Sequence, residues 1–170
     1  MSDNPCNVLF LCRANATLSL MAESLLRHWG EGRFNAYSAG LYPEAVMHPK
    51  ALALLEMMKL PTSGLQPKGW GQFSDLTPPR IDLIIILGSV FPEAVAPKWQ
   101  GQPVIVNWRL VDPIGQEGTQ RVRLLAFRNA LLELEQRIKA LITLPASSLD
   151  KTTLGQYVDE IGRTGLVPRY

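Results

Sequence analysis

Residues 7–23 read NVLFLCRANATLSLMAE and decide the fold of this chain. The apolar run from Val8 to Leu11 predicts a buried β-strand, a short loop follows Cys12, and a helix is expected to begin near Ser19. A loop that enters a helix N-terminus points backbone N–H groups inward, which makes an anion-binding site that also favours a thiolate. Position alone leaves two interpretations of Cys12, a nucleophile or a small buried hydrophobic residue.

Apolar runs alternate with helical patterns along the whole chain. We expect strands at 7–11, 35–38, 81–87 and 104–107, and helices at 19–30, 49–58, 90–97 and 121–142. The continuous apolar run at 81–87 is typical of a central parallel strand that is buried on both faces. This alternation predicts an α/β fold with a parallel sheet and right-handed crossovers. Ligands of such folds bind beyond the carboxyl ends of the strands, where Cys12 and Asp112 are both expected.

Composition predicts one soluble globular domain. The chain has 170 residues, 46% of them hydrophobic and 19% charged, with a formal charge of +2. The basic residues of 121–139 are spread along a predicted helix, which indicates a solvated face and no nucleic-acid partner. The longest apolar run, 81–91, is shorter than the roughly 20 residues that cross a membrane. Since the N-terminus has no signal-peptide pattern, a cytoplasmic location is expected.

The two cysteines are not expected to pair. Cys6 and Cys12 are six residues apart on a predicted strand, roughly 20 Å at about 3.3 Å per residue. A disulfide needs Cα atoms within about 7 Å. We interpret Cys6 as a small residue at the start of a strand, and we expect residues 1–145 to form the domain. Residues 146–170 are expected to form a partly helical tail that packs on the domain or extends from it.

The loop after Cys12 resembles that of the low-molecular-weight tyrosine phosphatases and of the arsenate reductases built on the same fold. In that family the cysteine is followed by five residues, an arginine, and a serine or threonine. Further matches occur at 21–23, 48–49, 68–73, 108–113, 126–128 and 159–163, and the last of these is closest to the arsenate reductase branch.

The resemblance implies a flavodoxin-like three-layer α/β sandwich with a central four-stranded parallel sheet. It implies that Cys12 attacks an oxyanion, either arsenate or a phosphate monoester, and that Asp112 protonates the leaving oxygen. The implied anion-binding loop consists of Arg13, Ala14, Asn15, Ala16, Thr17, Leu18 and Ser19.

Two loop positions fit a working site. Asn15 stands where a tight loop needs a residue that tolerates left-handed backbone angles. Ser19 is positioned to donate its hydroxyl to the thiolate or to cap the helix, and these roles are compatible. Asp112 precedes Pro113 as the acid does in the family, although an aspartate before proline also stabilises turns.

Several positions depart from the family pattern. Leu18 replaces the arginine that grips two oxyanion oxygens through its planar fork, and losing one such donor costs about 10²–10³ in rate. Ala14 replaces a glycine, which would strain the loop if the position needs a positive φ, and Ala16 replaces a serine. Compensation by Arg13, the neighbouring cation, is a hypothesis.

The redox cysteines of thioredoxin-coupled arsenate reductases are also missing. Ser89 and Ala96 occupy their two positions after the third predicted strand, and Thr17 stands where many reductases have another cysteine. An internal thiol relay is therefore excluded, and reduction would need a thiol electron donor from outside.

Three hypotheses follow: an enzyme with weak activity, a non-catalytic module that binds an anion or a phosphoprotein, or a fold kept for interaction through another surface. No cofactor and no metal are predicted. His28 and His48 lack metal-ligand spacing, so we interpret both as surface or packing residues.

Overall fold

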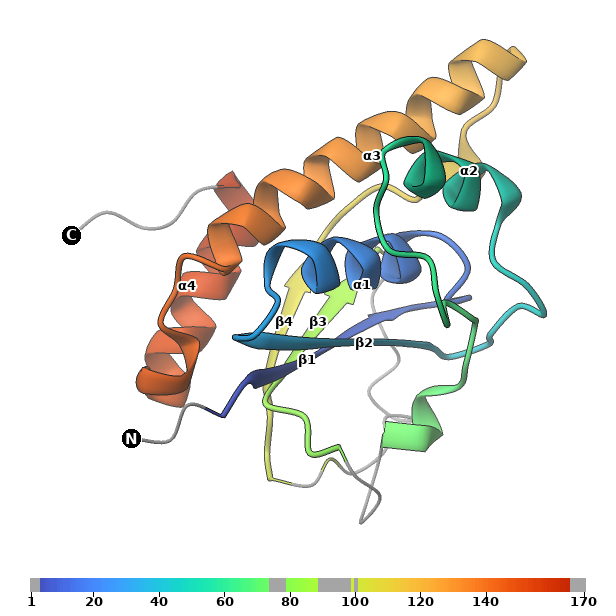
Figure 1. The fold of residues 1–170 in the computed structure, drawn as a ribbon. Helices are drawn as coiled ribbons and strands as arrows, with labels where there is room; N and C mark the ends of the chain where they lie inside the picture. Colours follow the sequence, from blue (N-terminus) through green and yellow to red (C-terminus); the bar gives the residue numbers. More distant parts are fainter. Residues whose placement is uncertain (1–3, 74–78, 89–98, 100, 166–170) are drawn as a thin grey trace.

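The computed structural model describes residues 4–73, 79–88, 99 and 101–165. Its four strands are β1 (Cys6–Cys12), β2 (Phe34–Gly40), β3 (Leu83–Leu87) and β4 (Val104–Trp108). They form one parallel sheet in the order β2-β1-β3-β4 (Figure 1). The predicted parallel α/β fold is confirmed. The carboxyl ends of all four strands therefore meet at one edge of the sheet, where Cys12 ends β1.

Four helices cover one face of this sheet (Figure 1). They are α1 (Leu18–Trp29), α2 (Pro49–Met57), α3 (Gln120–Leu141) and α4 (Lys151–Thr164). Alternate strand residues such as Val8, Phe10 and Ile85 point into this layer and are fully buried. The long crossover helices and the sheet thus share one hydrophobic core.

The other face of the sheet is packed by shorter segments. Leu9, Leu11 and Ile84 lie in a second apolar cluster with Phe73 of the 3₁₀-helix η1 (Trp70–Phe73) and with Trp99. The helix predicted over 90–97 lies outside the described residues. Two further 3₁₀-helices occur at η3 (Pro113–Gly115) and η4 (Ala146–Ser148).

The start of α1 differs from the prediction. The helix begins at Leu18 with Thr17 as its N-cap residue, and the Thr17 side chain makes no capping hydrogen bond. The prediction that Ser19 caps the helix is therefore wrong. The reason is local, since the Ser19 hydroxyl is engaged by the side chains of Cys12 and Asn15.

The C-terminal helix α4 contributes to the main core. Leu154, Val158 and Ile161 are buried, and the indole Nε1–H of Trp108 on β4 donates to the Val158 carbonyl at 2.9 Å. At Gly162, an added Cβ would lie 2.3 Å from Cδ1 of Trp108, so the helix approaches the ring too closely for any side chain. The division of the chain at residue 145 stays a prediction.

The first half of α3 extends past the rest of the domain (Figure 1). Leu125, which the pattern predicts on or near the apolar face, is 42% exposed. Further along the helix, Leu131, Leu134 and Ile138 are fully buried, as predicted. Within the described residues, no helix combines the length and the apolar character that crossing a membrane requires.

Candidate functional site

Cys12 lies at the carboxyl end of β1 and is nearly buried, with 7% of its surface exposed. Its Sγ accepts a hydrogen bond from the backbone N–H of Asn15 at 3.2 Å and lies 2.9 Å from the Ser19 Oγ. The Ser19 Oγ already accepts a bond from the Asn15 amide. Its own proton is therefore available to the sulfur, as the sequence predicts.

Asn15 holds the loop together. Its φ is +47°, the left-handed conformation that the sequence predicts for this position. The fully buried side chain donates from Nδ2 to the Ser19 Oγ at 2.6 Å and accepts from the Lys68 backbone N–H at 2.9 Å. Gly40 makes room for this arrangement, because a Cβ there would lie 2.8 Å from the Asn15 nitrogen.

The loop carbonyls point outward, toward the segment between β2 and α2. The backbone N–H groups of that segment bind them in four pairs: Leu41 to Cys12 at 3.3 Å, Tyr42 to Arg13 at 2.8 Å, Glu44 to Ala14 at 2.9 Å, and His48 to Ala16 at 2.9 Å. In a trans peptide, the C=O and the next N–H point in opposite directions. The N–H groups of residues 13, 14, 15 and 17 therefore face the inner side of the loop, where an anion would bind.

The remaining loop side chains take separate positions. Arg13 is exposed, and its guanidinium carbon lies 5.4 Å from the centre of the Tyr42 ring. The φ of Ala14 is not positive, so the strain considered for this substitution does not arise. Ala16 is buried. The Thr17 Oγ1 is buried and has no hydrogen-bond partner among the described residues.

Leu18 is part of the hydrophobic core. It is 1% exposed, and its Cδ1 lies 3.9 Å from the position that a Cβ would take at Gly88, just after β3. The residue that replaces the arginine of the family therefore fills apolar space beside the loop. It supplies neither charge nor a donor to the inner side of the loop.

Asp112 follows β4 at the same edge of the sheet. Its Oδ1 accepts from the Ile114 N–H at 2.9 Å and so caps η3, which is the turn-stabilising role considered above. This cap needs only one carboxylate oxygen. The side chain is exposed, so the second oxygen can reach solvent or a ligand.

His48 connects the loop with Asp112. Its backbone N–H binds the Ala16 carbonyl, its Nδ1 accepts from the Lys50 N–H at 3.2 Å, and its ring lies 4.7 Å from that of Phe127. Burial and the nearby positive charges of Lys50 and Arg123 lower the pKa of His48, whereas the Asp112 carboxylate raises it. The packing role predicted for His48 is confirmed, but the sequence did not indicate its place beside the loop.

A cluster of four polar side chains lies between α1 and β2: Glu23 and Arg27 on α1, Ser38 on β2, and Lys68. Glu23 is 2% exposed, and its Oε1 accepts from the Ser38 hydroxyl at 2.6 Å and lies 3.6 Å from the Lys68 Nζ. Arg27 pairs with the second oxygen. Burial lowers the pKa of Lys68, and the Glu23 charge opposes this shift. The Lys68 side chain is held by this cluster, and the Lys68 backbone N–H binds the Asn15 side chain. The cluster therefore helps to position Asn15, which holds the loop together.

Sequence reasoning missed most of this cluster. Lys68 stands in a stretch, 68–73, that supported the resemblance, and Glu23 stands in the helix opening. Neither stretch indicated that the two side chains meet. Among the described residues, no group of three or more His, Cys, Asp or Glu side chains could hold a metal ion. Cys6 and Cys12 are both free, as expected from their spacing.

Together these residues form a buried thiol inside a ring of inward-facing amides at the N-terminus of a 12-residue helix. Backbone N–H groups at a helix N-terminus are an arrangement that can bind an anion. The family model for low molecular weight phosphotyrosine protein phosphatase matches residues 7–154. The chain belongs to this family.

Similar proteins point to one branch of the family. A glutaredoxin arsenate reductase of Synechocystis is 30% identical over 79% of this chain and 95% of its own length. An arsenate reductase of Bacillus cereus is 31% identical over 71% of this chain and 88% of its length. The solved structure of an arsenate reductase in the phosphate binding state has a TM-score of 0.66, with 29% identity over 81% of this chain and 97% of that protein.

Proposed function

We propose that the Cys12 loop binds a small oxyanion, either arsenate, phosphate or a phosphate monoester, and that its turnover is weak or lost. The observation that carries the proposal is the loop itself, in which amides face inward around the Cys12 sulfur although Leu18 replaces the arginine. The buried, unpartnered Thr17 hydroxyl adds a polar group that a bound oxyanion would satisfy. A related arsenate reductase was solved in a phosphate binding state.

The chemistry of this site would follow its geometry. The Cys12 sulfur would attack the phosphorus of an ester, forming a S–P bond while the P–O bond to the leaving group breaks. Asp112 would give its proton to the leaving oxygen. With arsenate, a S–As bond would form and water would leave. Since the chain carries no internal relay cysteine, a thiol compound or a thiol protein would have to supply the electrons.

Leu18 in place of an arginine is expected to lower the rate of turnover. Loss of one preorganised donor costs about 10²–10³ in kcat, and a charged bidentate donor is worth at least as much. Arg13 is placed over Tyr42, so the proposal does not depend on compensation by that residue. Ground-state binding needs only the amides and the helix dipole, so it is expected to survive better than catalysis.

The alternative is a non-catalytic module that uses the loop to bind an anion or a phosphoprotein. The burial of Leu18 favours this alternative, because the apolar residue is integrated into the core around the end of β3. In both cases the oxyanion binds to the same amides. The two functions differ in whether Cys12 contributes more than packing.

The test compares the chain with Cys12→Ala, Leu18→Arg and the volume-conserving control Leu18→Met. Hydrolysis of an aryl phosphate, reduction of arsenate with dithiothreitol, and phosphate binding by calorimetry are measured for each. The proposal expects phosphate binding in all variants, low or no turnover in the wild-type chain, and a gain with Leu18→Arg only. Turnover that Cys12→Ala abolishes supports the enzyme, whereas binding without turnover supports the alternative.

Absence of phosphate binding from both the wild-type chain and folded Leu18→Arg would refute the proposed function. Folding of the variants is checked by urea unfolding, since an arginine in a buried site can destabilise the chain. Cys6 is not expected to supply a second reactive thiolate in these assays. It is 5% exposed, and burial together with the Asp82 charge raises the pKa of Cys6 to about 12.

A further inference from the structure

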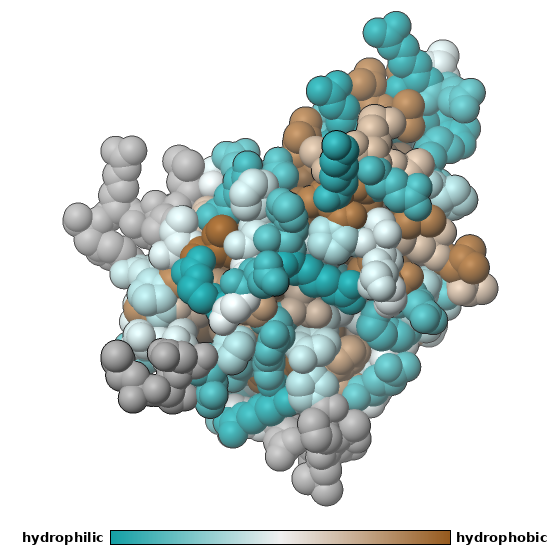
Figure 2. Space-filling view, viewed as in Figure 1, coloured by the Kyte–Doolittle hydropathy of each residue, from teal (hydrophilic) through white to brown (hydrophobic). Residues whose placement is uncertain are grey.

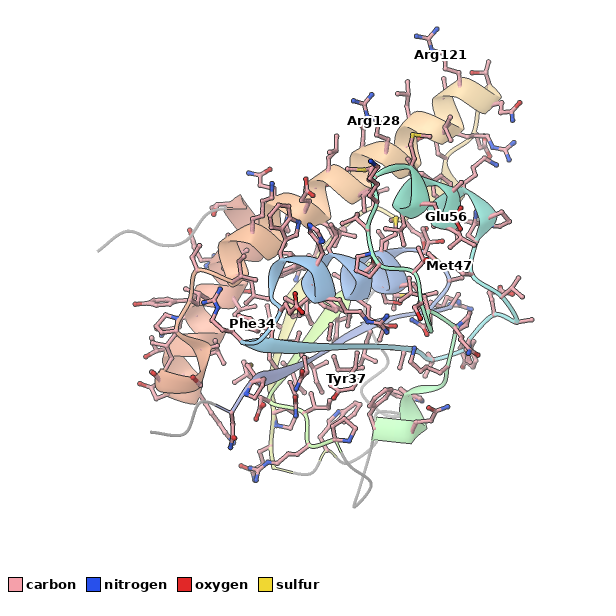
Figure 3. The ribbon with its side chains drawn as sticks, viewed as in Figure 1. Phe34, Tyr37, Met47, Glu56, Arg121 and Arg128 are labelled. Carbon is pink, nitrogen blue, oxygen red and sulfur yellow. The ribbon has the colours of Figure 1, made fainter. Side chains whose placement is uncertain are left out.

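The projecting half of α3 carries a row of exposed residues that the oxyanion site does not use. Arg121, Leu125, Arg128 and Leu132 follow one another at intervals of four, three and four residues, which places them on one side of the helix. All four are exposed, and the two leucines are 42% and 41% accessible. Figure 3 shows Arg121 and Arg128 pointing away from the domain. We call these four residues the arginine–leucine row.

The positive charge of this half of the helix has no acidic counterpart within the same half. Residues 120–132 contain three arginines and no acidic residue. Further along α3, Arg137 lies 3.0 Å from Glu133 and Lys139 lies 3.8 Å from Glu135. Within the described part of the chain, none of the three arginines of 120–132 takes part in an ion pair. Within the described residues, cations in the second half of α3 therefore form ion pairs, whereas those in the first half do not.

The exposed apolar residues of this half do not belong to the core. Two further aliphatic side chains flank the arginine–leucine row, Val122 at 42% and Leu124 at 48% exposure. The core side of α3 is already filled by Phe127, Leu131 and the residues that follow. Figure 2 shows hydrophobic patches between hydrophilic side chains on this projecting end. Several exposed aliphatic side chains gathered on one projecting helix favour an interaction site.

We propose that the arginine–leucine row docks an acidic, leucine-bearing helical segment of another protein. Charge complementarity selects the partner, because carboxylates about seven residues apart on a facing helix would lie opposite Arg121 and Arg128, with leucines packing between them. Pairing of this face with the same face of a second copy would gather the arginines of both copies in an interface to which residues 120–132 contribute no acidic side chain. A helix that lies in a lipid surface segregates its apolar and charged faces, whereas here arginine and leucine alternate along one row.

The docking site shares no residue with the oxyanion loop. Phe127, one residue before Arg128, lies on the buried side of α3 and contacts the ring of His48, whose backbone binds the loop. The arginine–leucine row lies on the exposed side of the same helix. The proposal does not depend on turnover at Cys12, and it can hold whether or not the oxyanion site is active.

The test uses the full chain and a fluorescein-labelled peptide of about 20 residues, which is roughly 30 Å long as a helix. One face of the peptide repeats glutamate and leucine at intervals of three and four, and a control peptide carries lysine in place of each glutamate. Fluorescence anisotropy measures binding to the wild-type chain, Arg128→Glu, Leu125→Ser and the charge-matched control Arg33→Glu. Arg33 is exposed and lies before β2, at the amino end of the sheet.

We expect the acidic peptide to bind the wild-type chain and Arg33→Glu equally, and Arg128→Glu about tenfold more weakly. Leu125→Ser is expected to weaken binding several-fold, and added salt to weaken it further. Equal affinity for Arg128→Glu and Arg33→Glu would overturn the proposal, as would tighter binding of the lysine peptide. Two other outcomes overturn it: co-flotation with phosphatidylserine vesicles that Arg128→Glu abolishes, or sedimentation as a dimer that Leu125→Ser dissociates.

Discussion

Asn15 is the residue whose removal should damage the loop most. Asn15→Ala removes two hydrogen bonds made by a fully buried side chain, one to the Ser19 Oγ and one from the Lys68 backbone N–H. It also leaves a non-glycine residue at a φ of +47°. Asn15→Gly removes the same two bonds but accepts this backbone conformation without cost. The two variants therefore separate the contribution of the side chain from that of the backbone.

The expected loss of stability comes from the two groups that Asn15 leaves without a hydrogen bond, the Ser19 hydroxyl and the Lys68 backbone N–H. A buried group that loses its hydrogen bond costs about 1–3 kcal/mol, so two such groups at the lower part of this range cost about 2–4 kcal/mol. Alanine in the left-handed conformation adds about 1 kcal/mol. The free energy of unfolding should fall by about 2–4 kcal/mol in Asn15→Gly and by about 3–5 kcal/mol in Asn15→Ala, a large part of the usual stability of a domain.

Urea unfolding under reducing conditions, followed by tryptophan fluorescence, measures both changes. Phosphate is then added to the folded variants, since a distorted loop should lose the midpoint shift that a bound ligand produces. Asn15→Gly as the less stable variant would refute the backbone argument. A loss below about 1 kcal/mol in both variants would refute the view that this side chain holds the loop together.

Two further predictions concern other parts of the fold. Gly162→Ala should destabilise the chain by about 1–3 kcal/mol, because its Cβ would overlap the Trp108 ring. Gly155→Ala should cost less, because its added Cβ would lie 3.3 Å from one methyl group of Val104 and approach no ring. Urea unfolding compares the two variants, and equal stability would contradict the packing argument. The lowered pKa of His48 means that its neutral form is favoured in the folded state, so its contribution to stability is complete above pH 6.5 and is lost as the pH falls below that value. His48→Asn keeps an acceptor for the Lys50 N–H but does not titrate. The free energy of unfolding of this variant should therefore change less between neutral pH and pH 5. A pH profile identical to that of the wild-type chain would argue against His48 as the titrating group.

The local part of the site could be predicted from the sequence, because it consists of contacts between near neighbours. Asn15 in a left-handed conformation and Ser19 within reach of the Cys12 sulfur both lie within eight residues of the strand end. The parallel sheet could be predicted as well, since buried strands and crossover helices have different periodicities. The start of α1 could not, because Ser19 lies inside the helix and its oxygen accepts from the Asn15 side chain rather than from a backbone N–H group.

The long-range part of the site could not be predicted in this way. The bond from Lys68 to Asn15 spans 53 residues, and the bond from Ser38 to Glu23 joins β2 to α1. No periodicity indicates which polar residues meet after the chain has folded. The exposed leucines of α3 show the same limit, because a helical stripe indicates an apolar face without showing where the domain ends.

Hydrogen bonds within the protein hold the loop in shape without a bound anion. Its carbonyls are held by the segment from Leu41 to His48, and Asn15 is held by the Lys68 backbone. An arginine at position 18 would take no part in these bonds, so Leu18 removes charge from the site without removing the structure that surrounds the charge. Anion binding and turnover are therefore separable in this chain. If Leu18→Arg stays folded and binds a phosphate ester without acting on it, the missing arginine does not by itself explain the lack of turnover, and the attack by Cys12 and the proton transfer from Asp112 become the next steps to test.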